Sequence, residues 1–327
     1  MVSLMKNSSP ASFNFQIAKV LGILIVATAH FFPDTMLWVP SSVALFIFGF
    51  SSAYFTHLKY TQHFDAFPYW TNKVIRLGYP LLVINVFLLV VSSIVSSRTI
   101  WVWQTPLHIV GLSGLLDWLH IDNASPLGNG MWFFTLLLVF YGVYPLLRMA
   151  NQHAVSSLLL LLIALAGMSY CHVQYPVGYY LWPTAFSFIF GVYIAGHPLR
   201  LPIPVYILGG VVSVFLMGML NFLLRVNAYN FFLIMAASAL FSVWLREAIL
   251  PAWLLRPTGY LSDIVLEIYL IHTYLFFVFT GSKFADYVLS MCVILLTAKL
   301  LQHATIRIER FSEHVGWGLL RKRKMLV

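Results

Sequence analysis

The chain has 327 residues, of which 61% are hydrophobic and only 9% are charged. This balance leaves too few polar side chains to cover a water-soluble globule, so it excludes the soluble classes of enzyme and binding domain. The formal net charge of +9 does not indicate a nucleic-acid partner, because the basic residues are scattered singly and form no patch interleaved with aromatics. Membrane lipid is therefore the expected surroundings.

Apolar runs of roughly 18 to 22 residues follow one another along the chain with short polar breaks, and each is long enough to cross a bilayer. We therefore predict an all-α polytopic membrane protein, with about ten transmembrane helices in one bundle and one membrane domain over residues 1–306. The predicted spans are 13–33, 38–58, 72–95, 128–148, 154–171, 178–196, 203–224, 229–245, 258–281 and 285–305.

Most lysines and arginines between these spans fall on the side of the two chain ends. Only Arg98, Arg225 and Lys283 fall on the opposite side. The positive-inside rule then places both termini in the cytoplasm and the protein in the cytoplasmic (inner) membrane. Residues 307–327 are expected to form a basic cytoplasmic tail on anionic headgroups.

The longest break between spans predicts an interfacial segment over residues 96–127. Its leucines recur at helical spacing, which is typical of an amphipathic helix lying on the outer surface of the membrane. The segment also carries Trp101, Trp103 and Trp118. These indoles are expected either to anchor the segment at the interface or to stack on sugar rings.

Ionisable side chains inside apolar spans are costly, so each is a functional candidate. In the first span, Lys19 and His30 lie roughly 16 Å apart along a helix and on nearly the same face. This spacing predicts a helix that lines a cavity, with an imidazole suited to proton transfer and with Asp34 placed to hold one ring nitrogen. The alternative is a histidine satisfied by a neighbouring helix, with Lys19 extending to the headgroups.

Two further spans carry such groups. Lys73 and Arg76 lie one turn apart at the start of the third span, where they either grip phosphates or only determine topology. Asp263, Glu267 and His272 fall within one apolar run, where they serve either a site or structural polar packing.

Five short motifs extend over nearly the whole chain. They are Lys19 with His30, Phe46-Ile47-Phe48-Gly49-Phe50, Lys73 with Arg76, Met131-Trp132-Phe133-Phe134, and Glu267-Ile268-Tyr269-Leu270-Ile271-His272. In order and spacing they resemble the integral membrane acyltransferase family 3. That family has arginine where this chain has Lys19 and Lys73, so the charge is kept and the bidentate fork is lost. The Lys19 form is similar to a branch that includes sugar O-acetylases.

The resemblance implies an acyltransferase that moves an acyl group, expected to be acetyl, from cytoplasmic acyl-CoA to a hydroxyl of a cell-surface or exported carbohydrate. It implies no metal. His30 would be the catalytic imidazole, with Asp34 and Glu267 as candidate catalytic carboxylates. The implied donor-binding residues are Lys19, Lys73 and Arg76, and the implied substrate-side residues are Trp132, Tyr269 and His272.

Two other functions fit the same residues. A secondary transporter or flippase for a lipid-linked or anionic solute would line its path with the charged groups of the first and ninth spans. A non-catalytic assembly subunit would not bind acyl-CoA at all.

Overall fold

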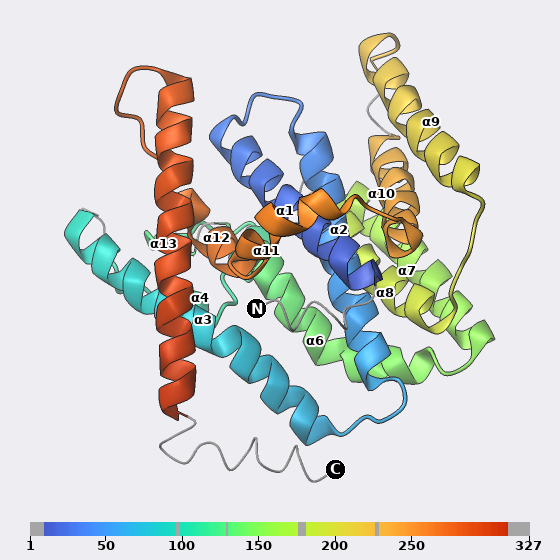
Figure 1. Cartoon of the computed structure of the whole chain (residues 1–327), viewed down its shortest axis with the longest axis horizontal. Coiled ribbons are helices and arrows are strands. Elements are labelled where there is room, and N and C mark those ends of the chain that lie inside the picture. The colour runs from blue at the N-terminus through green and yellow to red at the C-terminus, as the bar shows by residue number, and fades with distance from the viewer. Residues whose placement is uncertain (1–9, 96–98, 129, 176–180, 226–228, 313–327) are drawn as a thin grey trace. The chain divides into compact units, whose positions relative to one another are not determined.

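A computed structural model describes residues 10–95, 99–128, 130–175, 181–225 and 229–312. Within these ranges the chain forms helices and no strands (Figure 1). It divides into two compact units, and each is described by itself. Unit 1 is Met1–Gln62 with Gly142–Ser262, and unit 2 is His63–Tyr141 with Asp263–Val327.

The predicted helical membrane architecture is confirmed, with fewer long helices than expected. Among the described residues, eight helices are long and apolar enough to cross a membrane. They are α1 (Pro10–Phe31), α2 (Trp38–Tyr60), α3 (Ala66–Val95), α6 (Trp132–Ala150), α7 (Ala154–Gln174), α9 (Ile203–Phe222), α10 (Asn230–Glu247) and α13 (Lys283–Ser312). Part of the predicted tail continues α13 as far as Ser312, and residues 313–327 lie outside the described ranges.

The two other predicted spans do not form long helices. The span predicted at 178–196 is α8 (Leu181–Gly196), whose 16 described residues rise only roughly 24 Å. The span predicted at 258–281 is broken. It consists of α11 (Leu255–Ser262), α12 (Val265–Ile271) and the single turn η3 (His272–Tyr274), and an irregular stretch follows.

Side chains of α13 explain why the broken span does not continue as a helix. The Phe277 N–H donates to Ser290 Oγ at 3.0 Å, and the Phe279 and Thr280 N–H groups donate to Asp286 Oδ1 at 3.2 and 2.8 Å. These acceptors replace the helical carbonyls that the backbone would otherwise need in an apolar environment. An apolar run alone does not reveal such partners.

Unit 1 is built around the close pairing of α2 and α8. A Cβ at Gly191 would lie 2.5 Å from the Phe50 carbonyl and 2.9 Å from Ala53 Cβ, and one at Gly49 would meet Ser187. The two glycines therefore let the helices approach closely, as small residues do in membrane helix pairs. The rings of Phe15, Phe50 and Phe190 pack beside this contact.

Replacing Gly191 with leucine should separate α2 from α8 and destabilise unit 1. The added side chain meets backbone atoms, which cannot move aside as a flexible side chain would. We expect a loss of about 3 kcal/mol, or failure to accumulate as a monodisperse protein. Thermal unfolding in detergent measures this. Gly167→Leu, at a position where a Cβ meets nothing within 4 Å, is the control and should behave like the wild type.

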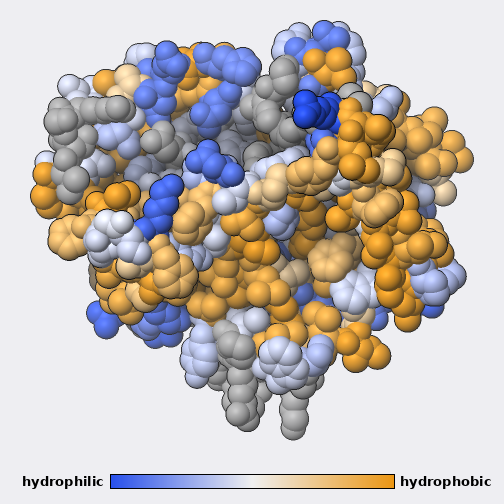
Figure 2. Space-filling model, turned by 90° about the horizontal axis from the view of Figure 1, so that it is seen from above, coloured by the Kyte–Doolittle hydropathy of each residue, from blue (hydrophilic) through white to orange (hydrophobic). Residues whose placement is uncertain are grey.

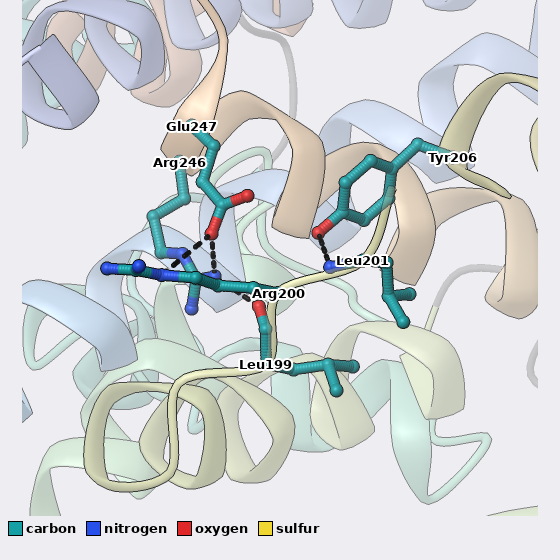
Figure 3. A network of polar contacts seen from close by, with 6 residues as sticks. All are labelled: Leu199, Arg200, Leu201, Tyr206, Arg246 and Glu247. Carbon is teal, nitrogen blue, oxygen red and sulfur yellow. Dashed lines mark hydrogen bonds and ion pairs between the residues drawn. The ribbon is translucent and has the colours of Figure 1, made fainter. Parts of the chain in front are cut away.

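A polar network holds the end of α10 in unit 1 (Figure 3). Arg246 donates to the Leu199 carbonyl and to Glu247 Oε1, and Arg200 Nε lies 4.0 Å from the same carboxylate oxygen. Asn14 of α1 donates to the carbonyls of Leu245 and Ala248 at 2.8 and 2.7 Å. The last carbonyls of α10 thus accept hydrogen bonds from a side chain of α1. Arg246 also binds the loop before α9 to the end of α10.

In unit 2, α3 packs against α13, and α12 packs against both. The described part of the segment expected at the interface, residues 99–127, does not contain the single amphipathic helix that the leucine spacing predicted. Residues 99–128 instead contain two five-residue helices, α4 (Thr105–Ile109) and α5 (Gly114–Trp118), with buried polar residues. Asn85 Nδ2 of α3 donates to the Ile109 carbonyl at 2.8 Å. The segment is therefore held against a long helix, which the leucine spacing does not reveal.

The surface agrees with lipid as the main solvent. Figure 2 shows hydrophobic residues over much of the visible face. In α9, Leu208, Val211 and Phe215 are each exposed by 60% or more. Apolar patches of this kind are rare on soluble monomers and are typical of membrane-facing helices.

Candidate functional site

Helix α1 turns the stripe that carries Lys19 and His30 toward protein. Ile23 and Val26 lie between them on the same stripe, because the steps from Lys19 to Ile23, to Val26 and to His30 are four, three and four residues. Ile23 and Val26 are only 1% and 3% exposed. Lys19 is half-buried, and His30 is exposed in the last turn of the helix. The cation and the imidazole therefore lie at the two ends of a stripe whose middle, Ile23 and Val26, is buried.

Asp34 is placed differently from the expectation. Helix α1 ends at Phe31, so Asp34 lies exposed in the turn that follows and is not on a further helical turn. The structure shows no hydrogen bond between its carboxylate and His30. The argument from four-residue spacing does not apply here, because that spacing brings side chains together only within a helix.

The two cations of α3 differ in their surroundings. Lys73 is 7% exposed, and its Nζ lies 3.6 Å from the ring centroid of Tyr141 and 5.5 Å from that of Tyr69. Tyr69 in turn donates its hydroxyl to the Tyr141 carbonyl at 2.9 Å. Arg76 is exposed and has no hydrogen bond or ion pair within the described ranges. The structure therefore does not show Lys73 and Arg76 as one paired binding site.

The broken span places a buried histidine in unit 2. His272 is 1% exposed, and its Nδ1 lies 2.7 Å from the Tyr269 carbonyl and 3.2 Å from the Ile268 carbonyl. Because carbonyls only accept, a hydrogen on Nδ1 satisfies these contacts.

Glu267 lies on α12 beside a cation from α13. Its side chain is 4% exposed, and its Oε2 makes no hydrogen bond among the described residues. Lys299 of α13 lies within electrostatic range of this carboxyl, and its Nζ donates to Gln302 Oε1 at 2.7 Å. Gln302 Nε2 donates to the Asp263 carbonyl at 3.1 Å, which ties α13 to the start of α12.

The end of the broken span is fixed by tyrosine hydroxyls. Tyr269 OH accepts from the Phe133 N–H at 3.0 Å and donates to the Gly130 carbonyl at 2.5 Å. Tyr274 OH accepts from the Gly128 N–H at 2.6 Å. Both glycines have positive φ angles, 95° at Gly128 and 78° at Gly130, so the chain turns sharply where the tyrosines hold it.

Trp132 begins α6 beside this turn. It is half-buried and stands edge-on to Phe133, with ring centroids 6.1 Å apart. Its substrate-side role stays a prediction.

Unit 2 therefore contains irregular backbone within an apolar, helical part of the chain. Such backbone is tolerated at membrane depth only where protein buries it or where it lines a cavity, and broken helices in membrane proteins often carry binding sites. Sequence reasoning missed Gly128, Gly130 and Tyr274. The sequence feature that could have indicated the two glycines is their close spacing just before an apolar run.

The predicted site residues fall into two groups. Unit 1 holds those of α1 and the turn after it, and unit 2 holds those of α3, α6, α12 and η3. The unit 1 group is Lys19, His30 and Asp34. The unit 2 group is Lys73, Arg76, Trp132, Glu267, Tyr269 and His272.

Comparison with known proteins identifies the family of this chain. A family model described as an acyltransferase domain, Acyl_transf_3, matches residues 13–301. No curated protein and no solved structure gives a significant match. The family match covers most of the chain and includes every residue of both groups. The chain therefore belongs to acyltransferase family 3 and is a multi-pass membrane acyltransferase.

Proposed function

We propose that this acyltransferase takes its acyl group, most simply acetyl, from cytoplasmic acyl-CoA and transfers it to a hydroxyl of a cell-surface or exported carbohydrate. Its membrane would be the cytoplasmic membrane, with both chain ends on the cytoplasmic side. The observation that supports this best is the inward stripe of α1, which carries a cation and an imidazole within a family of acyltransferases.

In the proposed reaction His30 acts as the general base. A ring nitrogen takes the proton of the acceptor hydroxyl while the oxygen attacks the thioester carbonyl. The C–S bond then breaks, coenzyme A leaves as its thiolate, and the imidazolium returns the proton to that sulfur. The products are an ester and free coenzyme A. In the alternative, an imidazole nitrogen displaces the thiolate to form an acyl-histidine, and the acceptor hydroxyl then displaces the imidazole while its proton passes to the thiolate, which gives the same products.

The charge pattern supports a phosphate-bearing donor. Acyl-CoA carries several phosphate charges, and the cations implied for its binding are Lys19, Lys73 and Arg76.

The exposed tryptophans of unit 2 support a carbohydrate acceptor. Trp101 and Trp103 are 70% and 63% exposed, and flat indole faces stack on sugar rings. Interfacial anchoring would leave the same indoles exposed. Replacing both with phenylalanine and measuring KM for the acceptor separates the two roles.

The test of the proposed function uses purified full-length protein in nonionic detergent. Labelled acetyl-CoA should be consumed, with release of free thiol, when a polysaccharide or oligosaccharide acceptor is present. The broken helix of unit 2 also fits a transporter, because such helices hold solutes in many carriers. A protein that leaves acetyl-CoA intact yet moves solute across vesicles would overturn the enzymatic proposal.

A further inference from the structure

Lys73 lies in an aromatic cage formed by Tyr69 of α3 and Tyr141 of α6. Its ammonium lies 3.6 Å from the Tyr141 centroid, and the Tyr69 centroid is 5.5 Å away. The hydrogen bond from Tyr69 OH to the Tyr141 carbonyl holds the two residues of the cage together. A cation over a ring face at this distance is attracted by the ring quadrupole, and more strongly when water is excluded.

Burial separates Lys73 from the other cation of its motif. Lys73 is 7% exposed, whereas Arg76, one turn later on the same helix, is exposed to solvent. A phosphate that met Lys73 would have to displace the Tyr141 face from its ammonium. The same phosphate reaches Arg76 without moving any side chain of the cage.

We propose that Lys73 positions α3 against α6 from inside this cage, and that Arg76 is the α3 residue that contacts the phosphates of the donor. The inference rests on the proposed use of acyl-CoA and assigns different roles to Lys73 and Arg76. Lys73 is then a positioning residue. Its effect on transfer passes through the packing of α3 against α6, so it acts on both donors alike.

The size of the cage also explains why lysine replaces arginine at this position. In an arginine side chain the guanidinium carbon would stand about where Nζ stands, and two further nitrogens would extend beyond it. Those nitrogens bring volume and hydrogen-bond donors into a buried aromatic site, where unpaired donors are costly. A compact ammonium fits over the ring face without them.

The test compares acetyl-CoA with acetyl-pantetheine, which lacks the phosphates, in nonionic detergent without added lipid. Arg76→Gln should raise KM for acetyl-CoA roughly tenfold or more and leave KM for acetyl-pantetheine unchanged. Lys73→Met should lower kcat for both donors alike, keep the ratio of the two KM values, and lower the melting temperature by roughly 2–6 °C. Lys73→Arg should show the same loss of stability.

Three further variants complete the design. Tyr141→Phe keeps the ring and should match the wild type, whereas Tyr141→Leu should reproduce Lys73→Met. Arg200→Gln, at an exposed arginine of unit 1, controls for general loss of positive charge and should leave both KM values unchanged.

Two results would overturn the inference. One is a Lys73→Met enzyme whose KM rises for acetyl-CoA alone, as in Arg76→Gln. The other is a Lys73→Arg enzyme that keeps its stability and binds acetyl-CoA as tightly as the wild type or more so, as a phosphate ligand would. Wild-type protein that does not consume acetyl-CoA would refute the proposed function and this inference together, whereas normal wild-type turnover with either result above refutes only the role of Lys73.

Discussion

Replacing His30 with alanine should lower acyl transfer from labelled acetyl-CoA by roughly 10²- to 10⁴-fold, the range that a general base contributes. The loss should fall on kcat, because the imidazole acts on the proton of the acceptor and not on the phosphates of the donor. His30 lies in the last turn of α1 and is exposed, so alanine there should not unfold unit 1. Single-turnover kinetics with purified protein measures the chemical step directly.

His153→Ala is the matched control for this variant. His153 is also exposed and lies next to a membrane-spanning helix, where its side chain makes no capping hydrogen bond with α7. It should retain wild-type transfer. If His30→Ala transferred acetyl groups as fast as His153→Ala does, His30 would not be the base.

The second large effect is expected at Glu267. Its carboxyl is 4% exposed, and Oε2 has no hydrogen-bond partner among the described residues. A buried polar atom without a partner costs free energy, so a carboxyl retained in this state is a candidate for chemistry. Glu267→Gln should therefore reduce kcat roughly 100-fold or more while keeping or raising the melting temperature.

A loss of kcat together with an unchanged or higher melting temperature distinguishes a site residue from a structural one. If Glu267 only packed α12 against α13, the amide would change stability and leave kcat close to the wild-type value. Asp263→Asn is the control, since that carboxyl lies in the break before α12 and is exposed. Differential scanning fluorimetry and acetyl transfer, measured on the same preparations, give both quantities.

The fold class followed from local composition. Each apolar run is long enough to cross lipid by itself, so the positions of α1, α2, α3, α7, α9, α10 and α13 could be predicted without knowing their neighbours. The family could also be predicted, because it depends on the order of short motifs along the chain, and the match over residues 13–301 confirms it.

The break in the ninth apolar run could not be predicted in the same way. Its backbone N–H groups at 277, 279 and 280 bond to Ser290 and Asp286, which belong to the following helix. The turn at Gly128 and Gly130 likewise depends on tyrosine hydroxyls far along the chain. Hydropathy within one run contains no information about such partners.

The sequence by itself determined that this chain is a helical membrane acyltransferase, and which ionisable groups its apolar segments carry. Only the tertiary structure decided the surroundings of those groups. Lys73 and Arg76 look equivalent at three-residue spacing, yet Tyr141 of another helix buries one and leaves the other exposed. The physical reason is that span length and hydrophobicity are sums over neighbouring residues, whereas burial and hydrogen-bond partners come from residues that only folding brings near.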